Sequence, residues 1–149
     1  AVPEWMSVKE LLAFYADFYD DFQLEAARQM LDALGLASAK QIRQMSKGSR
    51  EKVQLILTMS RQARLYLLDE PIGGVDPATR DYILSTIIAN YNPEASVVIS
   101  THLIADVEKI LDEVVFLQEG RVLLHDEVDA LREEKGKSID ALFREVFKC

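Results

Sequence analysis

The sequence contains very little cysteine, has no long apolar run and carries no excess of positive charge. Cys149 is the only cysteine, so one chain can form neither a disulfide nor a cysteine metal site, and a reducing, cytoplasmic compartment is expected. The apolar runs fall far short of the roughly 18–20 residues that span a bilayer, and the opening residues lack the apolar segment of a secretory signal. The formal net charge of −8 argues against a broad nucleic-acid-binding face.

The 149 residues do contain enough apolar material for a folded domain. The composition is 49% hydrophobic and 28% charged, which is typical of a soluble globular protein and not of a disordered tail. A chain of this length is enough for one ordinary domain with a core of its own.

The first third of the chain is expected to be helical. Ser7 and Glu10 have the spacing of a capping box, and apolar residues then recur on one helical face. A second helical stretch follows, and Gly35 is placed to end it. A third helix is predicted from about Ser49.

From residue 65 onward, short apolar runs alternate with helical patterns. Residues 65–68 and 96–100 are typical of buried strands. Between them, Asp76 and Pro77 have the order of an N-cap and a first helical residue. The helix that follows is expected to bury a stripe of four residues: Tyr82, Ile83, Ile87 and Ile88.

The remaining third continues this alternation. Residues 103–111 predict another amphipathic helix, residues 114–117 and 121–124 predict two strands joined by a tight turn, and the tail predicts two short helices. Strands that alternate with helices indicate an α/β fold with a parallel sheet.

Three side chains with useful chemistry follow the two predicted parallel strands. Asp69 and Glu70 end the first strand and His102 follows the second; ligands of parallel sheets bind beyond the carboxyl ends of the strands. One carboxylate can hold Mg²⁺, its neighbour can activate a water as general base, and the histidine can stabilise phosphate charge. Two alternatives stay open: the acidic pair before proline also suits a plain turn, and His102 also suits the neighbour of a helix cap.

A second candidate site lies at the start of the third predicted helix, in the segment MSKGSR. Backbone N–H groups at a helix N-terminus attract anions, and Ser46 and Ser49 add hydroxyl donors. Gly48 lets a phosphate approach the backbone closely. An ordinary capped helix start shows the same residues, so this segment alone is a weak signal.

The order of the segments is more informative than any one of them. MSKGSREKVQLILTMSRQARLYLLDEP, GGVDP, STH and LDEVVFLQEGRVL follow one another closely between residues 45 and 125. Together they resemble the ATP-binding-cassette (ABC) ATPases, the nucleotide-binding subunits of ABC transporters. The resemblance implies an α/β, P-loop NTPase-like ABC ATPase fold that is incomplete. It would comprise a helical subdomain at residues 1–48, ending in the signature motif, and the C-terminal part of the ATPase core at residues 49–149.

The resemblance also implies roles for the signature segment. Ser46, Lys47, Gly48 and Ser49 would contact the ATP that is held by a second cassette subunit in a head-to-tail dimer. The chain departs from the family pattern here, since Lys47 stands where Gly is usual and Ser49 where Gln is usual. Such a change indicates a subfamily and leaves the assignment intact.

Four further residues match the family's motifs. Asp69 would be the acid linked to Mg²⁺, and Glu70 the catalytic glutamate that activates water. Asp76 falls on the loop that communicates across the dimer and is counted among the expected ATP-binding residues, although GGVD replaces the commoner SALD there. His102 matches the switch histidine near the γ-phosphate.

The implied function is to couple ATP binding and hydrolysis to membrane transport. ATP and Mg²⁺ are the implied cofactors, and a second cassette and a transmembrane permease the implied partners, with no nucleic acid. The chain would be cytoplasmic and peripheral on the inner face of the cell membrane. Five aromatic residues of the helical subdomain are candidates for the permease contact, although internal packing is the expected role of most: Trp5, Phe14, Tyr15, Phe18 and Tyr19.

The phosphate-binding pattern G-x-x-x-x-G-K-[ST] does not occur in the chain. We therefore expect a C-terminal fragment of a longer cassette that is inactive on its own and that self-associates through an exposed strand edge. A truncated, non-hydrolytic cassette that binds a partner is the alternative. A soluble ABC-type ATPase of DNA repair or translation is disfavoured, because the helical stretch is compact.

Overall fold

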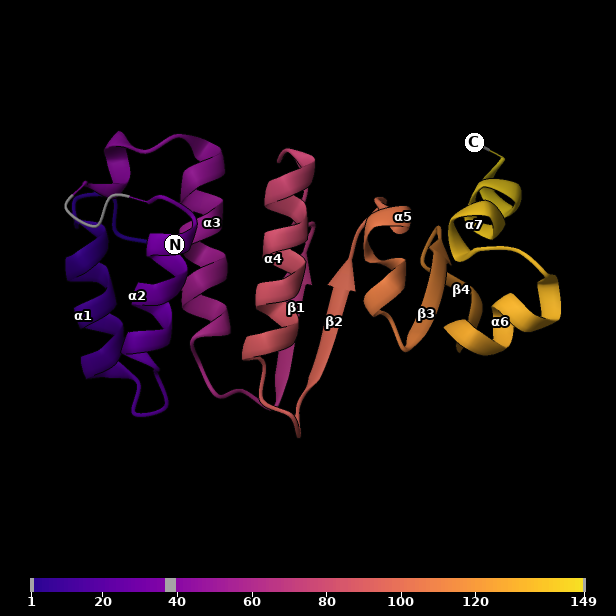
Figure 1. Ribbon diagram of the computed structural model, residues 1–149, viewed down its shortest axis with the longest axis horizontal. Coiled ribbons are helices and arrows are strands. Elements are labelled where there is room, and N and C mark those ends of the chain that lie inside the picture. Colours follow the sequence, from indigo (N-terminus) through magenta and orange to yellow (C-terminus); the bar gives the residue numbers. More distant parts are fainter. Residues whose placement is uncertain (1, 37–39, 149) are drawn as a thin grey trace. The chain divides into compact units, whose positions relative to one another are not determined.

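The computed structural model describes residues 2–36 and 40–148, which form two compact units. The first unit is Ala1–Ser100 and the second is Thr101–Cys149, and Figure 1 follows the chain through both. Each unit has helices and a pair of strands. The expected boundary between residues 48 and 49 stays a prediction.

The first unit begins with the predicted helices: α1 (Val8–Phe18), α2 (Leu24–Ala33) and α3 (Lys47–Met59), with the 3-10 helix η1 (Ile42–Gln44) before α3. Ser7 caps α1, because its hydroxyl accepts a hydrogen bond from the backbone N–H of Glu10 at 3.1 Å. Gly35 follows α2 with a φ of +67°, a conformation that glycine adopts without strain. Helix α3 begins two residues earlier than predicted because Ser46 is its N-cap.

The predicted parallel strands are present in the first unit. Strand β1 (Leu65–Asp69) pairs in parallel with β2 (Ser96–Ser100), and α4 (Pro77–Asn90) connects them. Asp76 caps α4 as expected, and Pro77 is its first residue. The register pairs Asp69 with Ser100, so both strands end at the same edge of the sheet.

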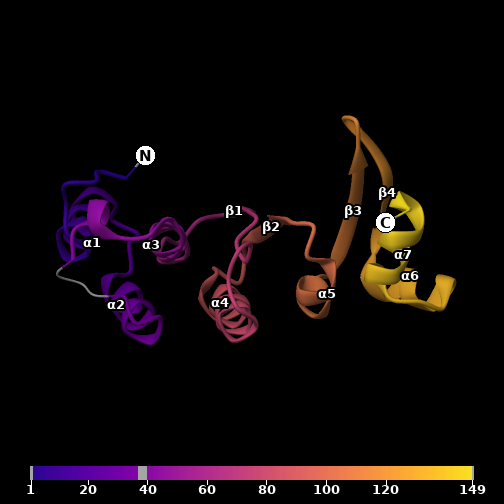
Figure 2. The ribbon, with the colours of Figure 1, turned by 90° about the horizontal axis from the view of Figure 1, so that it is seen from above.

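The expectation that both strands are buried is wrong for one face of the sheet. Tyr66 and Leu68 are buried, but Leu65, Leu67 and Val98 are 52%, 68% and 51% exposed. Figure 2 shows the reason: α4 lies on one side of the β1–β2 pair, and no other described element of the first unit covers the other side. An apolar sheet face therefore remains open to solvent.

The predicted stripe of α4 is also partly wrong. Ile83 and Ile87 are buried and Tyr82 is half-buried, but Ile88 is 48% exposed and Leu84 is buried in its place. Residues 83, 84 and 87 occupy one face of an α-helix, and residue 88 lies at the edge of that face.

The second unit contains α5 (Ile104–Val107), the 3-10 helix η2 (Glu108–Ile110), β3 (Glu113–Gln118), β4 (Arg121–Glu127), α6 (Val128–Lys135) and α7 (Ile139–Phe147). Strands β3 and β4 form the predicted antiparallel hairpin. Its turn residues, Glu119 and Gly120, both have positive φ, which matches the twist of a two-residue hairpin turn. The single helix predicted over 103–111 is instead one α-turn followed by a 3-10 turn. The buried core of this unit comes from α5, β3, α6 and α7: Ile104, Val114, Phe116, Val128, Leu131, Ile139 and Leu142.

Candidate functional site

The ends of β1 and β2 bring together the first predicted site residues. The Ser100 hydroxyl donates a hydrogen bond to Oδ1 of Asp69 at 2.6 Å. The backbone N–H of Glu70 donates to the carbonyl oxygen of Ser100 at 2.7 Å, which extends the ladder by one residue. The parallel pairing thus fixes the adjacent carboxylates at the carboxyl edge of the sheet, where ligands of such sheets bind.

Glu70 has an unusual backbone conformation. Its φ is +46°, a left-handed conformation that costs a non-glycine residue about 1–2 kcal/mol. The turn that follows holds it there, because the N–H of Gly73 donates to the Glu70 carbonyl at 3.3 Å and Ile72 is completely buried. Backbone strain of this kind is concentrated at functional sites, so Glu70 is a stronger candidate than its position alone suggests.

Gly73 leaves room beside the Glu70 side chain. A Cβ atom at residue 73 would lie 3.8 Å from Oε2 and 3.7 Å from Cβ of Glu70, which is ordinary contact. A longer side chain branching from that Cβ would compete with the carboxylate for space.

The oxygen donors at this edge fit a magnesium ion that also binds a nucleotide. Mg²⁺ is usually held by one or two protein carboxylates together with waters and substrate phosphates. Asp69 supplies one exposed carboxylate, next to the hydroxyl of Ser100. The described residues contain no group of three or more His, Cys, Asp or Glu side chains that could hold a metal. The donor set suits a shared ion and not an ion enclosed by protein alone.

His102 belongs to the second unit. It is exposed and lies two residues before α5, in a turn where the N–H of Leu103 donates to Oγ1 of Thr101 at 3.0 Å. In the chain it follows the last residue of β2 by two positions. Its role at the nucleotide stays a prediction.

The signature segment forms the capped N-terminus of α3. The Ser46 hydroxyl accepts from the N–H of Ser49 at 3.2 Å and donates to the Ser49 hydroxyl at 3.0 Å. Lys47 and Gly48 are exposed, and a Cβ atom on Gly48 would meet nothing within 4 Å. Packing within the chain therefore does not require a glycine there, which leaves an external ligand as a reason for it.

Arg50 supports this helix tip, a role that no motif in the sequence indicates. Its guanidinium donates to the carbonyl oxygens of Met45 and Arg43, both at 3.2 Å, and to Oε1 of Glu4 at 3.0 Å. The segment before Ser46 is thereby tied to α3. Glu4 lies 46 residues away in the chain, so no local pattern could have identified the pair.

Asp76 already has a structural task as the N-cap of α4. Its carboxylate accepts from the backbone N–H of Thr79 at 3.1 Å and from the Thr79 hydroxyl at 2.5 Å. These hydrogen bonds, the side-chain one first, lower the pKa of Asp76 below its ordinary value. The charged carboxylate is thus explained by the helix start, and the expected contact with ATP stays a prediction.

Comparison with known proteins supports the nucleotide-binding interpretation. Residues 3–73 match the family model described as ABC transporter. The chain is 26% identical over 127 residues to the ABC transporter ATP-binding protein YtrB of Bacillus subtilis (strain 168). The aligned region covers 85% of the chain and 44% of YtrB. It is 32% identical over 106 residues to the ABC-type transporter ATP-binding protein EcsA of the same organism. This aligned region covers 69% of the chain and 43% of EcsA.

The fold agrees with these sequence matches. A solved structure of an ATP binding subunit of an ABC transporter superposes with a TM-score of 0.78 at 26% identity, over 99% of this chain and 65% of that one. The chain spans less than half the length of the curated relatives it matches. Its α/β fold accordingly corresponds to part of a P-loop NTPase-like cassette. The chain belongs to the ABC ATPase family.

Proposed function

We propose that the chain is the helical subdomain and the C-terminal part of the ATPase core of an ABC transporter ATP-binding subunit, divided at residues 48 and 49. The whole subunit couples ATP binding and hydrolysis to transport. The observation that carries this proposal is the edge of the β1–β2 sheet, where Asp69 is hydrogen-bonded to Ser100 and Glu70 has a left-handed backbone.

The carboxylates at this edge have different roles. Asp69 would hold Mg²⁺, which supplies neutralising charge to the phosphates when it is bound. Glu70 would accept a proton from the attacking water, and the turn to Gly73 fixes its strained backbone at the end of the strand. His102 stabilises the charge of the γ-phosphate.

The helix tip acts on a second nucleotide. Ser46, Lys47, Gly48 and Ser49 contact the ATP of a second cassette in a head-to-tail dimer, where the α3 dipole and the exposed backbone favour phosphate. Asp76 lies near the same dimer contact. Arg50 keeps the tip in place through its three hydrogen bonds.

A groove in the first unit suits a transmembrane permease. Its open cavity of about 480 Å³ is lined in part by Tyr15, Tyr19 and Arg61, and the Arg61 guanidinium lies 3.7 Å from the centre of the Tyr19 ring. Phe14 and Phe18 stack on each other at 6.0 Å beside it and are 46% and 67% exposed.

Internal packing therefore does not account for either phenylalanine, nor for Trp5, which is 63% exposed. The exposed acids Asp17 and Asp20 lie on the same stretch of chain. Cytoplasmic loops of membrane proteins carry an excess of Lys and Arg. An apolar, basic permease segment is complementary to this surface.

In this proposal the subunit lies on the cytoplasmic side of the membrane and is held to the inner face by its permease partner. None of the helices in the described part of the chain is long and apolar enough to span a bilayer.

Replacement of the proposed base tests the function. In the complete ATP-binding subunit, Glu70→Gln is expected to lower turnover by about 10²-fold or more, because the amide cannot accept the proton, while ATP affinity is retained. Glu94→Gln, at an exposed position before β2, is the matched control. Unchanged turnover in Glu70→Gln would remove Glu70 from this role.

The isolated chain is a second test. It contains no G-x-x-x-x-G-K-[ST] pattern to hold the β- and γ-phosphates, so we expect neither tight ATP binding nor hydrolysis. Isothermal titration with Mg-ATP measures this directly. Micromolar affinity would contradict the expectation.

A further inference from the structure

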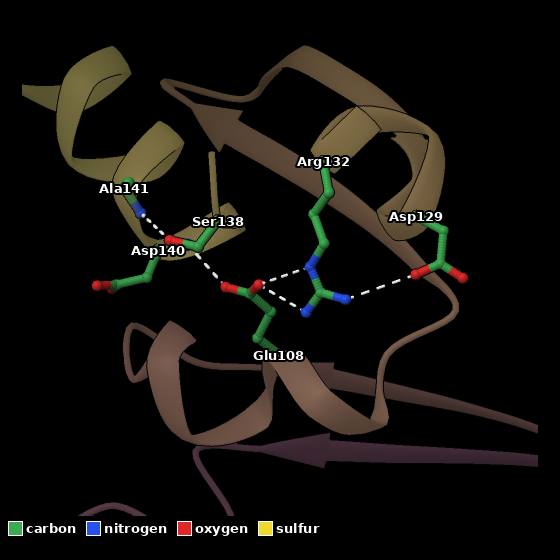
Figure 3. Close-up of polar contacts among 6 residues, drawn as sticks. All are labelled: Glu108, Asp129, Arg132, Ser138, Asp140 and Ala141. Atoms are coloured by element: carbon green, nitrogen blue, oxygen red, sulfur yellow. Dashed lines mark hydrogen bonds and ion pairs between the residues drawn. The ribbon is translucent and has the colours of Figure 1, made fainter. Parts of the chain in front are cut away.

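One buried carboxylate joins three helical elements of the second unit. Glu108 is the first residue of η2 and is only 8% exposed. Its Oε2 accepts hydrogen bonds from Nε and Nη2 of Arg132 on α6, at 2.8 and 2.6 Å. Its Oε1 accepts from the backbone N–H of Asp140 in α7 at 2.9 Å, as Figure 3 shows. Neither the sequence motifs nor the proposed mechanism assigns Glu108 a role.

The surroundings of Glu108 favour its charged form. Burial raises the pKa of Glu108, but hydrogen bonds from the Asp140 N–H, the Arg132 side chain and the Ile139 N–H outweigh it and bring the pKa below its ordinary value. The carboxylate also lies at the N-terminus of the nine-residue helix α7, where negative charge is stabilised. It shares the capping of α7 with Ser138, whose hydroxyl accepts from the N–H of Ala141 at 3.1 Å.

Glu108 is connected to His102 by a very short element. The two residues are separated only by Leu103 and by α5, which is four residues long. A single helical turn is not stable on its own, so tertiary contacts must fix its position. Ile104 and Val107 supply apolar contacts, since they are 7% and 1% exposed. Glu108 supplies the polar contact at the end of α5.

We propose that Glu108 is a positioning residue for His102. By holding the end of α5 to α6 and α7, it fixes the orientation of the helical turn that begins two residues after the histidine. The catalytic meaning of this position rests on the proposed function, but the structural link does not.

Nuclear magnetic resonance of the full chain tests the structural link. The chain has two histidines, His102 and His125, and both lie in the second unit. Glu108→Gln keeps the side-chain size but turns an amide toward Arg132. We expect the His102 imidazole signal to shift or broaden, while that of His125, on the hairpin, stays in place. Glu133→Gln, at an exposed site on α6, should move neither signal.

The outcomes distinguish a positioning role for His102 from a role that is limited to anchoring α7. An unchanged His102 signal, in a folded Glu108→Gln chain whose α7 amides lose exchange protection, would show that Glu108 only fastens α7 and would overturn the proposal. If Glu108→Gln unfolds the unit, Arg132→Lys takes its place, because it keeps the cation but loses the paired contact. The same local change at His102 is then expected, and its absence would again overturn the proposal.

Activity of the complete subunit separates this inference from the proposed function. Glu108→Gln is expected to lower kcat by about 10-fold to 10²-fold with an unchanged KM for ATP, since displacement of a reacting group by about 1 Å costs that much. Glu108→Asp should restore part of the rate. A shifted His102 signal with unchanged kcat would support positioning and would refute the catalytic role of His102.

Discussion

Tyr66 is the residue on which the placement of β1 most depends. Its side chain is 1% exposed, and its hydroxyl joins the loop before the strand to the loop before β2. The hydroxyl donates to the carbonyl of Arg61 at 2.5 Å and accepts from the N–H of Ala63 at 3.1 Å. A third, longer contact comes from the N–H of Asn92 at 3.4 Å. Tyr66→Phe removes one oxygen atom and leaves these backbone groups with reduced hydrogen bonding.

The expected loss of stability follows from the hydrogen bonds that the Tyr66 hydroxyl makes. An unsatisfied buried polar group costs about 1–3 kcal/mol. Because these loops reach solvent in part, we expect Tyr66→Phe to lower the free energy of unfolding by about 2 kcal/mol. With a slope of about 2 kcal/mol per molar urea, the midpoint should fall by about 1 M.

Fluorescence of Trp5, the only tryptophan and a residue of the same unit, measures this midpoint during urea unfolding. Tyr82→Phe on α4 is the matched control, because the Tyr82 hydroxyl has no hydrogen-bond partner among the described residues; it should change the free energy by less than about 0.5 kcal/mol. A Tyr66→Phe midpoint equal to that of the control would refute the reasoning.

Two further predictions concern acid stability and association. Glu108 has a lowered pKa in the folded chain, so its contribution is present above the unfolded pKa of about 4.3 and is lost as pH falls through the folded value. Thermal unfolding from pH 6 to 3 should show a steeper loss in the parent than in Glu108→Gln, and equal slopes would contradict this. Self-association is expected through the exposed strand edge and the open apolar face beside it, so Leu67→Lys on that face should weaken the association measured by sedimentation; a parent chain that is monomeric at high concentration would contradict the expectation.

Local signals predicted most of the secondary structure. Ser7 and Asp76 were identifiable as N-caps because the hydrogen bonds that they accept come from residues only three positions away. Gly35 was identifiable as a helix stop because the positive φ that commonly ends a helix favours glycine. The acidic pair at the end of β1 was identifiable as a candidate site because ligands of parallel sheets bind beyond the carboxyl ends of the strands.

Features that depend on distant parts of the chain were not predictable. The ion pair of Glu108 with Arg132 spans 24 residues, and that of Arg50 with Glu4 spans 46. The positive φ of Glu70 has no sequence signature, since glutamate rarely adopts it. The apolar pattern of β1 predicted burial, but burial also depends on which elements cover the sheet, and α4 covers only one side.

The β3–β4 hairpin of the second unit also has exposed apolar side chains on its strands. Val115, Leu117 and Val122 are 47%, 63% and 61% exposed, and the β3–β4 register pairs the last two directly. A fluorescent dye that binds apolar surface, such as ANS, should therefore bind the native chain. Such dye binding is commonly used as a mark of a molten globule. For this chain it would report correctly folded strands, and near-UV circular dichroism is the better criterion of native packing.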